Sequence, residues 1–212
     1  MLKDIHTHRL SGNPDTELLS CSFRDASTLP FQQAVHLSVG IHPWYITEED
    51  YPQQQAWIDQ LIGHDSRVRA VGEGGLDKLC TTPMALQMKA FRWLIERSEE
   101  YHLPLVIHCV KCMDEMIRLK KEDKPSSPWI IHGFRGKAQQ AQEYLRHGFY
   151  LSFGERYSAD TLRQIPLERL LLETDESVRT MDEIYQRAAI CKEIPLKTLE
   201  DSVFENINRV FY

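Results

Sequence analysis

Residues 103–108 read Leu-Pro-Leu-Val-Ile-His, and this stretch decides the fold. A run of aliphatic residues opens after a proline and stops on a histidine. Apolar, mostly aliphatic runs that stop at or near an ionisable residue recur at 68–73 (Val-Arg-Ala-Val-Gly-Glu), 129–132 (Trp-Ile-Ile-His) and 170–175 (Leu-Leu-Leu-Glu-Thr-Asp). Short apolar runs bounded by Gly, Pro or polar residues are consistent with buried parallel strands. We therefore expect a parallel sheet whose strands end on ionisable side chains.

The order of the expected elements favours a closed barrel. Strands are expected at 1–6, 17–23, 35–41, 68–72, 104–108, 129–132, 149–153 and 170–174. Helical patterns occupy 52–63 and 86–101, and a last helix starts at the capping-box-like pair Thr198 and Asp201. This alternation predicts the α/β class and a TIM-type (β/α)8 barrel. Because 9–16 and 24–34 look too polar or irregular for full helices, the barrel should be compact and slightly irregular.

Composition sets broad limits on what the chain does. Its 212 residues fit a single domain, 1–212, near the lower end of the length range for such barrels. The hydrophobic content of 42% is ordinary for a globular protein. The formal net charge of −6 argues against a broad basic surface for gripping duplex DNA. Two bound divalent cations would nevertheless add about +4 locally.

Sequence signals of location are few. No apolar run approaches the ~20 residues that a membrane-spanning helix needs, and no basic-then-apolar leader is recognisable. The five cysteines have no disulfide-framework spacing, which fits a reducing compartment. We expect a cytoplasmic protein without membrane association, and no obligate protein partner is evident.

A histidine pair near the start of the chain points to a metal. In Asp-Ile-His-Thr-His, at 4–8, His6 and His8 lie two apart on an expected strand and so share one face. Such a pair is a weak signal alone, because each residue can equally be a cap or turn residue. The signal strengthens with the ionisable residues at the other strand ends, which are Glu73, His108, His132 and Asp175. Four imidazoles and two carboxylates at the working rim of a parallel barrel suit a pair of divalent ions.

Eight ordered motifs resemble the TatD family of metal-dependent hydrolases, within the amidohydrolase-like barrels. They cover nearly the whole chain: 5–8 (Ile-His-Thr-His), 39–44 (Val-Gly-Ile-His-Pro-Trp), 71–77 (Val-Gly-Glu-Gly-Gly-Leu-Asp), 103–108, 131–136 (Ile-His-Gly-Phe-Arg-Gly), 148–153 (Gly-Phe-Tyr-Leu-Ser-Phe), 171–175 (Leu-Leu-Glu-Thr-Asp) and 205–211 (Glu-Asn-Ile-Asn-Arg-Val-Phe).

The resemblance implies two bound divalent ions, with Zn, Mg, Mn and Ni all acceptable to the ligands. It implies one ion on His6, His8 and Asp175, the other on His108 and His132, and Glu73 between them. Asp175 would also orient the attacking water and accept its proton, and His42 would face the substrate. Family members are often described as deoxyribonucleases, some of them exonucleases that act on single-stranded ends.

The chain also departs from the family pattern. Cys109 follows His108 where the family commonly has serine, and Gly133 and Arg135 replace a cysteine and a serine. The loop that usually follows Asp175 is absent, because helix-like sequence resumes by Met181. The metal residues are thus complete, whereas elements that would contact a nucleic acid strand look reduced. Metal-dependent hydrolysis is therefore the firmer expectation, and DNA as substrate the weaker one.

Several other residues have two readings. Arg135 follows His132 on an expected rim loop, where its guanidinium would bind phosphate or simply lie on the surface. Trp44 would stack on a base or pack over Pro43. Asp77 is expected to stabilise its loop as an acceptor. The pair formed by Cys109 and Cys112 lacks a second pair to complete a zinc site, and the remaining histidines, His36, His64, His102 and His147, are expected to be structural or exposed.

Three functions are compatible with these features. The first is a two-metal hydrolase whose activated water attacks a phosphodiester, as in a 3′ exonuclease on single-stranded DNA. The second is an amidohydrolase-like enzyme cleaving a small ester, amide or phosphate ester, which the shortened loops would favour. The third is a non-enzymatic barrel that keeps metal for stability or partner binding, and the complete ligand set disfavours it.

Overall fold

The computed structural model describes residues 2–212, so Met1 of the expected first strand lies outside the described residues. Eight strands form one sheet in chain order, and every neighbouring pair is parallel: β1 (Asp4–Thr7), β2 (Glu17–Cys21), β3 (His36–Val39), β4 (Val68–Asp77), β5 (Leu105–Val110), β6 (Trp129–Ile131), β7 (Tyr150–Phe153) and β8 (Leu170–Leu172). This is the expected TIM-type barrel.

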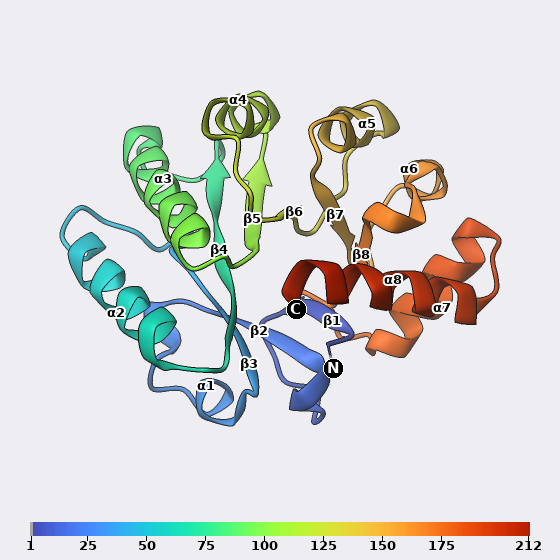
Figure 1. Cartoon of the computed structure of the whole chain (residues 1–212), viewed down its shortest axis with the longest axis horizontal. Coiled ribbons are helices and arrows are strands. Elements are labelled where there is room, and N and C mark those ends of the chain that lie inside the picture. The colour runs from blue at the N-terminus through green and yellow to red at the C-terminus, as the bar shows by residue number, and fades with distance from the viewer. Residues whose placement is uncertain (1) are drawn as a thin grey trace.

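Helices cover the outside of the strands. They are α2 (Tyr51–His64), α3 (Met84–Glu100), α4 (Met113–Asp123), α5 (Ala138–Arg146), α6 (Ala159–Gln164), α7 (Met181–Lys192) and α8 (Leu196–Phe211). Figure 1 shows α2 to α7 following one another around the strands in chain order. Within the described part, 2–212, no helix combines the length and the apolar character needed to cross a membrane.

The first two crossovers are short, as expected from their polar sequences. A single 3-10 turn, η1 (Pro14–Thr16), joins β1 to β2. Between β2 and β3 lie only η2 (Phe23–Asp25) and the five-residue helix α1 (Leu29–Gln33). Neither connection carries a full-length crossover helix.

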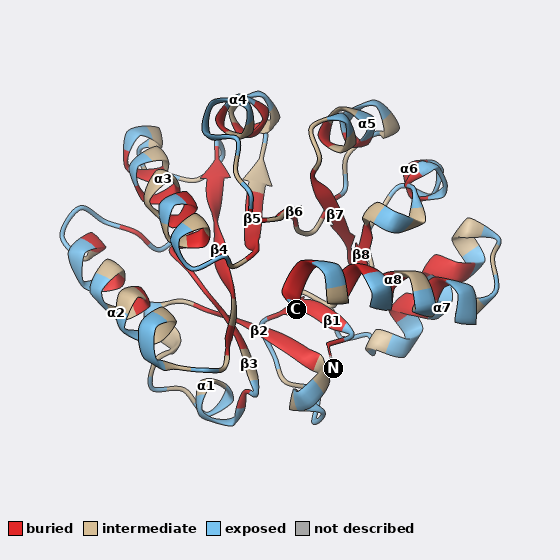
Figure 2. Cartoon of the chain, viewed as in Figure 1, coloured by how far each residue is buried: buried red, intermediate tan, exposed pale blue. Residues whose placement is uncertain are grey.

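The core consists of the strands and the inner faces of the helices, which are the buried segments in Figure 2. The sequence of α3 explains why this segment is an amphipathic helix. Its apolar residues recur every three or four positions and form one stripe, which is buried against the sheet: Leu86, Ala90, Phe91, Leu94 and Ile95.

Two expected boundaries differ from the structure. Strand β4 continues to Asp77 rather than ending at residue 72, so Glu73 lies within the strand. The glycines that look like a strand end instead allow close pairing with β5, because a Cβ at Gly75 would collide with the carbonyl oxygen of His108. Helix α8 starts at Leu196, after Pro195, rather than at the Thr198 and Asp201 pair. Pro195 is the N-cap residue, with its φ fixed by the ring, and no side chain caps this end of the helix.

The barrel closes between β1 and the segment that follows β8. Thr7 and Asp175 form an isolated parallel bridge, in which the Asp175 amide donates to the His6 carbonyl at 2.9 Å and the His8 amide donates to the Asp175 carbonyl at 3.3 Å. The buried carboxylate of Asp4 accepts hydrogen bonds from the Thr174 amide (3.0 Å) and hydroxyl (2.6 Å), and from the His6 amide (3.2 Å). Asp4 thereby ties the strand that carries His6 to the segment that carries Asp175.

Replacing Asp4 by alanine is expected to lower the free energy of unfolding by about 2–4 kcal/mol, because three donors lose their acceptor in the interior. Urea denaturation measures the loss. Asp182→Ala is the matched control, since that carboxylate is largely exposed and only 4.0 Å from Lys3 Nζ. An equal effect from both variants would mean that Asp4 does not stabilise the closure of the barrel between β1 and the segment after β8.

Candidate metal centre

The strand ends bring the six expected metal residues to one mouth of the barrel. His6 lies on β1 and His8 just beyond it. Glu73 lies on β4 and His108 on β5. His132 and Asp175 follow the short strands β6 and β8. Because all the strands are parallel, their carboxyl ends share this mouth, where ligands and catalytic groups gather in such barrels.

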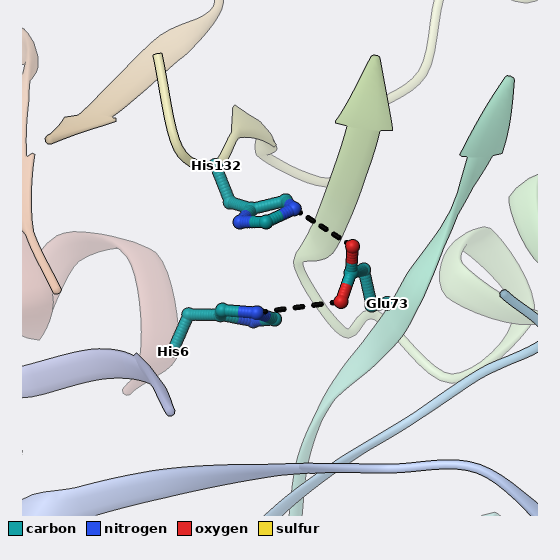
Figure 3. Close-up of side chains that lie close together, drawn as sticks. All are labelled: His6, Glu73 and His132. Atoms are coloured by element: carbon teal, nitrogen blue, oxygen red, sulfur yellow. Dashed lines mark hydrogen bonds and ion pairs between the residues drawn. The ribbon is translucent and has the colours of Figure 1, made fainter. Parts of the chain in front are cut away.

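Glu73 lies at the centre of the group, and its two carboxylate oxygens face different imidazoles. Oε1 is 2.8 Å from both His108 Nδ1 and His132 Nε2. Oε2 is 3.3 Å from His6 Nε2 and 3.4 Å from His8 Nε2. Figure 3 shows Glu73 reaching between His6 and His132. A carboxylate placed in this way can join two cations, one on each oxygen.

Asp175 lies on the His6 and His8 side of the centre. Its Oδ1 is 3.7 Å from His8 Nε2 and 3.9 Å from His6 Nε2. Its amide donates to the His6 carbonyl at 2.9 Å, and its backbone is left-handed with φ of 56°. A left-handed aspartate is uncommon, and such conformations cluster at functional sites.

The donor atoms form several groups close enough to share an ion. One contains His6, His8 and Asp175, the set that the family resemblance assigns to one ion. A second contains Glu73, His108 and His42, whose Nε2 is 3.1 Å from Glu73 Oε1. His132 falls with His6 and Glu73, and also with Glu173 and Asp175, rather than in a triad with His108. His42, expected only to face the substrate, therefore lies among the candidate ligands.

The chemistry of the donors fits a cation. His6 Nε2 and Glu73 Oε2 are buried 3.3 Å apart, yet neither makes a hydrogen bond among the described residues. The two atoms approach each other as an ion pair rather than through a hydrogen bond, and buried polar atoms without a hydrogen bond are costly and rare in native structures. Nitrogen and oxygen donors of this kind are the ligands that Zn, Mn and related divalent ions accept.

The charges of the buried carboxylate and imidazoles in the centre shift one another's pKa values. Burial pushes the pKa of Glu73 upward, but the charge on His132 and the hydrogen bonds from its histidine neighbours outweigh burial, so this pKa lies well below its usual range. Burial lowers the pKa of His132, yet the nearby Glu73 charge raises it well above the ordinary value. For His6, burial dominates and lowers the pKa. These shifts favour the metal-binding forms of Glu73 and His6, whereas a cation at His132 would have to displace the proton that the neighbouring carboxylates stabilise there.

Glu173 is a site residue that the sequence reasoning missed. It is fully buried, and its Oε1 accepts the Gly133 amide at 2.7 Å and lies 3.4 Å from His132 Nδ1. A carboxylate behind a metal-binding histidine fixes the orientation of its ring. The available signal was strand periodicity, because residues 173 and 175 are two apart and share a face.

Glu173→Gln is expected to weaken metal binding or activity by about 10–100-fold, since His132 loses its charged partner while the shape is kept. Metal titration and steady-state kinetics measure the change. Glu155→Gln is the control, because Glu155 lines the same mouth but bonds Ser177 at 2.8 Å rather than a histidine. If Glu173→Gln binds metal and turns over like wild type, the positioning role is wrong.

A small cavity of about 130 Å³ opens beside Asp175. Its lining includes Arg135, Arg156 and Glu176. Arg135 Nη2 is 3.6 Å from Asp175 Oδ2, and its side chain is 55% exposed. The guanidinium therefore lies at the edge of the metal centre and reaches solvent, as a substrate-binding arginine would.

The remaining candidates lie outside the metal groups. All five cysteines are free, and Cys109 Sγ contacts the Tyr144 hydroxyl at 3.2 Å. Across residues 2–212, no candidate metal group contains a cysteine or any of His36, His64, His102 and His147. Asp77 accepts the Leu79 amide at 2.7 Å, and its Oδ2 lies 3.3 Å from Nε2 of the candidate ligand His108.

A (β/α)8 barrel with this ring of imidazoles and carboxylates at its carboxyl mouth defines the class of metal-dependent hydrolase barrels. The model of the TatD-related DNase family matches residues 22–212. The chain belongs to that family.

Individual relatives agree with this assignment. The chain is 30% identical over 202 residues to the uncharacterised metal-dependent hydrolase YabD of Bacillus subtilis, covering 84% of this chain and 77% of YabD. It is 32% identical over 148 residues to the human 3′-5′ RNA nuclease TATDN2, covering 64% of this chain but 19% of that protein. The crystal structure of YjjV, a TatD homologue from Escherichia coli, superposes with a TM-score of 0.81 at 18% identity, covering 100% of this chain and 97% of YjjV. At this level of sequence identity, the similarity to YjjV concerns the fold alone.

Proposed function

We propose that this protein is a two-metal phosphodiesterase that removes nucleotides from the 3′ end of single-stranded DNA. The observation that carries the proposal is Glu73, whose two oxygens face separate sets of imidazoles. The names of the family and of TATDN2 support a nucleic acid substrate. When bound, a pair of divalent ions would lower the pKa of water and stabilise charge on phosphate oxygens.

The residues of the chain supply the remaining steps. The ions would be held by six side chains: His6, His8, His108, His132, Glu73 and Asp175. Asp175 is partly exposed at the mouth, where its carboxylate orients the attacking water and accepts its proton. Arg135 is directed toward the same carboxylate and binds a phosphate oxygen of the substrate.

A substrate screen with defined metals tests the proposal. Protein purified without chelator is analysed for metal content, then stripped and reloaded with Zn, Mg, Mn or Ni. Each form is incubated with single-stranded DNA labelled at one end, with RNA of the same sequence, and with p-nitrophenyl phosphate esters. We expect stepwise release of nucleotides from the 3′ end of DNA. Cleavage of RNA but not of DNA would overturn DNA as the substrate. Release of nucleotides from the 5′ end would overturn the proposed direction of cleavage.

A second candidate function is hydrolysis of a small ester, amide or phosphate ester. The short connections after β1 and β2 favour it, because they leave little protein above the mouth to hold a polymer. In the same screen, turnover of the p-nitrophenyl esters with no cleavage of either nucleic acid would establish this alternative. Absence of turnover in every metal-loaded form would support the third function, a non-enzymatic barrel that keeps metal for stability or partner binding.

Arg135→Ala is expected to raise KM for a phosphodiester by about 10-fold or more with a smaller change in kcat, because a charge-assisted contact to phosphate is lost. Arg156→Ala is the control, since Arg156 lines the same cavity but pairs with Glu155 at 3.4 Å rather than with Asp175. An unchanged KM in Arg135→Ala would remove Arg135 from the substrate site.

A further inference from the structure

Two large apolar side chains are exposed beside the metal centre. Trp44 is 54% exposed and Leu79 is 66% exposed. Trp44 lies in the loop after β3 and Leu79 in the loop after β4, so both follow strand ends at the catalytic mouth. With this much of its surface exposed, Trp44 is not part of the buried core. The exposed indole is thus available to a ligand that enters this mouth.

A buried carboxylate holds this surface in place. Asp77 Oδ2 accepts a hydrogen bond from the indole Nε1 of Trp44 at 2.7 Å. The other oxygen, Oδ1, accepts the amide of Leu79 at 2.7 Å. The amide of Trp44 also donates to His42 Nδ1 at 3.1 Å. The indole is therefore fixed at both its edge and its backbone, and its ordering costs little when a ligand binds.

The fixed indole borders the candidate metal ligands directly. The centroid of its ring system is 5.0 Å from that of His42 and 5.7 Å from that of His108. His108 Nδ1 is in turn 2.8 Å from Glu73 Oε1. A phosphate at the metal centre would thus have an aromatic surface within reach of its attached nucleoside.

We propose that Trp44 is the stacking platform for a nucleobase next to the scissile phosphate, so that the site takes single-stranded nucleic acid rather than small esters. This rests on the proposed function. Stacking on an aromatic side chain tolerates every base, because each base has a π face. It also requires an unpaired base, because bases inside a duplex already stack on one another. Trp44 therefore determines specificity and takes no part in the chemical step.

The test compares oligothymidylate with an oligonucleotide of the same length that carries abasic residues at its 3′ end. Trp44→Ala is expected to lower kcat/KM on oligothymidylate by about 10–100-fold, mostly through KM, the range measured when a stacking aromatic is removed. On the abasic oligonucleotide the variant and wild type should be equal. Trp44→Phe loses the same bond to Asp77 but keeps a ring, so it should retain most of the activity. Tyr101→Ala, an exposed aromatic at the far end of α3, is the control.

A binding measurement separates this proposal from the proposed function. Metal-loaded protein is titrated with phosphorothioate oligothymidylate while tryptophan fluorescence is recorded. We expect quenching in wild type that Trp44→Phe largely loses. Cleavage of oligothymidylate at equal rates by wild type and Trp44→Ala would overturn the stacking role alone, as would quenching that persists in Trp44→Phe. No cleavage and no binding of any oligonucleotide by wild type would overturn both.

Discussion

Glu73→Gln is expected to abolish tight binding of at least one divalent ion and to lower kcat by more than about a hundredfold. The substitution keeps the size of the side chain but removes a charge that five imidazoles face within 3.4 Å. Loss of a residue that only orients a ligand costs about 10–100-fold, so loss of the shared carboxylate should exceed that range.

Two measurements check this expectation. Elemental analysis counts the ions per chain, and thermal unfolding with and without added metal reports binding apart from activity, because a ligand that binds only the native state raises Tm. Metal should raise the Tm of wild type clearly and that of Glu73→Gln little or not at all. Glu17→Gln is the matched control, since Glu17 is also buried but lies at the start of β2, away from the mouth. A variant with full metal content and near-normal kcat would refute the central role of Glu73.

Much of the fold could be predicted because buried parallel strands leave a plain pattern. Apolar runs such as 129–131 and 170–172 have few interpretations other than a buried strand when they alternate with helical stretches. The ionisable residue at the end of each run also indicated which mouth would carry the site. Glycine is harder to interpret, because the same residue ends a strand or allows close pairing. The run around Glu73 therefore looked like a loop although β4 continues through it.

Grouping of the ligands could not be predicted in the same way. Which histidines share a cation depends on the tilt and register of strands across the mouth, and local sequence does not record these. His42 lies 3.3 Å from His108 Nδ1 for this reason, although its motif indicated only a substrate contact. Glu173 escaped notice because it sits inside a strand-like run, where a buried acid is normally disfavoured.

Asp175→Asn is expected to lower kcat by about 10²–10⁴-fold, the contribution of a positioned proton acceptor. The amide keeps an oxygen where Oδ1 approaches His6 and His8, so metal binding should weaken without being lost. Kinetics at rising metal concentration separate the two roles of Asp175. A ligand defect disappears once metal saturates the site, whereas a missing proton acceptor leaves kcat low at every concentration.

Glu176→Gln is the matched control for Asp175→Asn. Glu176 is the exposed neighbour of Asp175 and lines the same cavity, but it belongs to none of the candidate metal groups among residues 2–212. It therefore loses the same charge at nearly the same place without touching the metal centre. We expect Glu176→Gln to retain kcat within a factor of about two, since an exposed charge outside the candidate metal groups interacts only weakly with the site. If both variants fell equally, the effect would be one of overall charge at the mouth. If Asp175→Asn recovered fully at saturating metal, Asp175 would be a ligand, and another group would have to accept the proton.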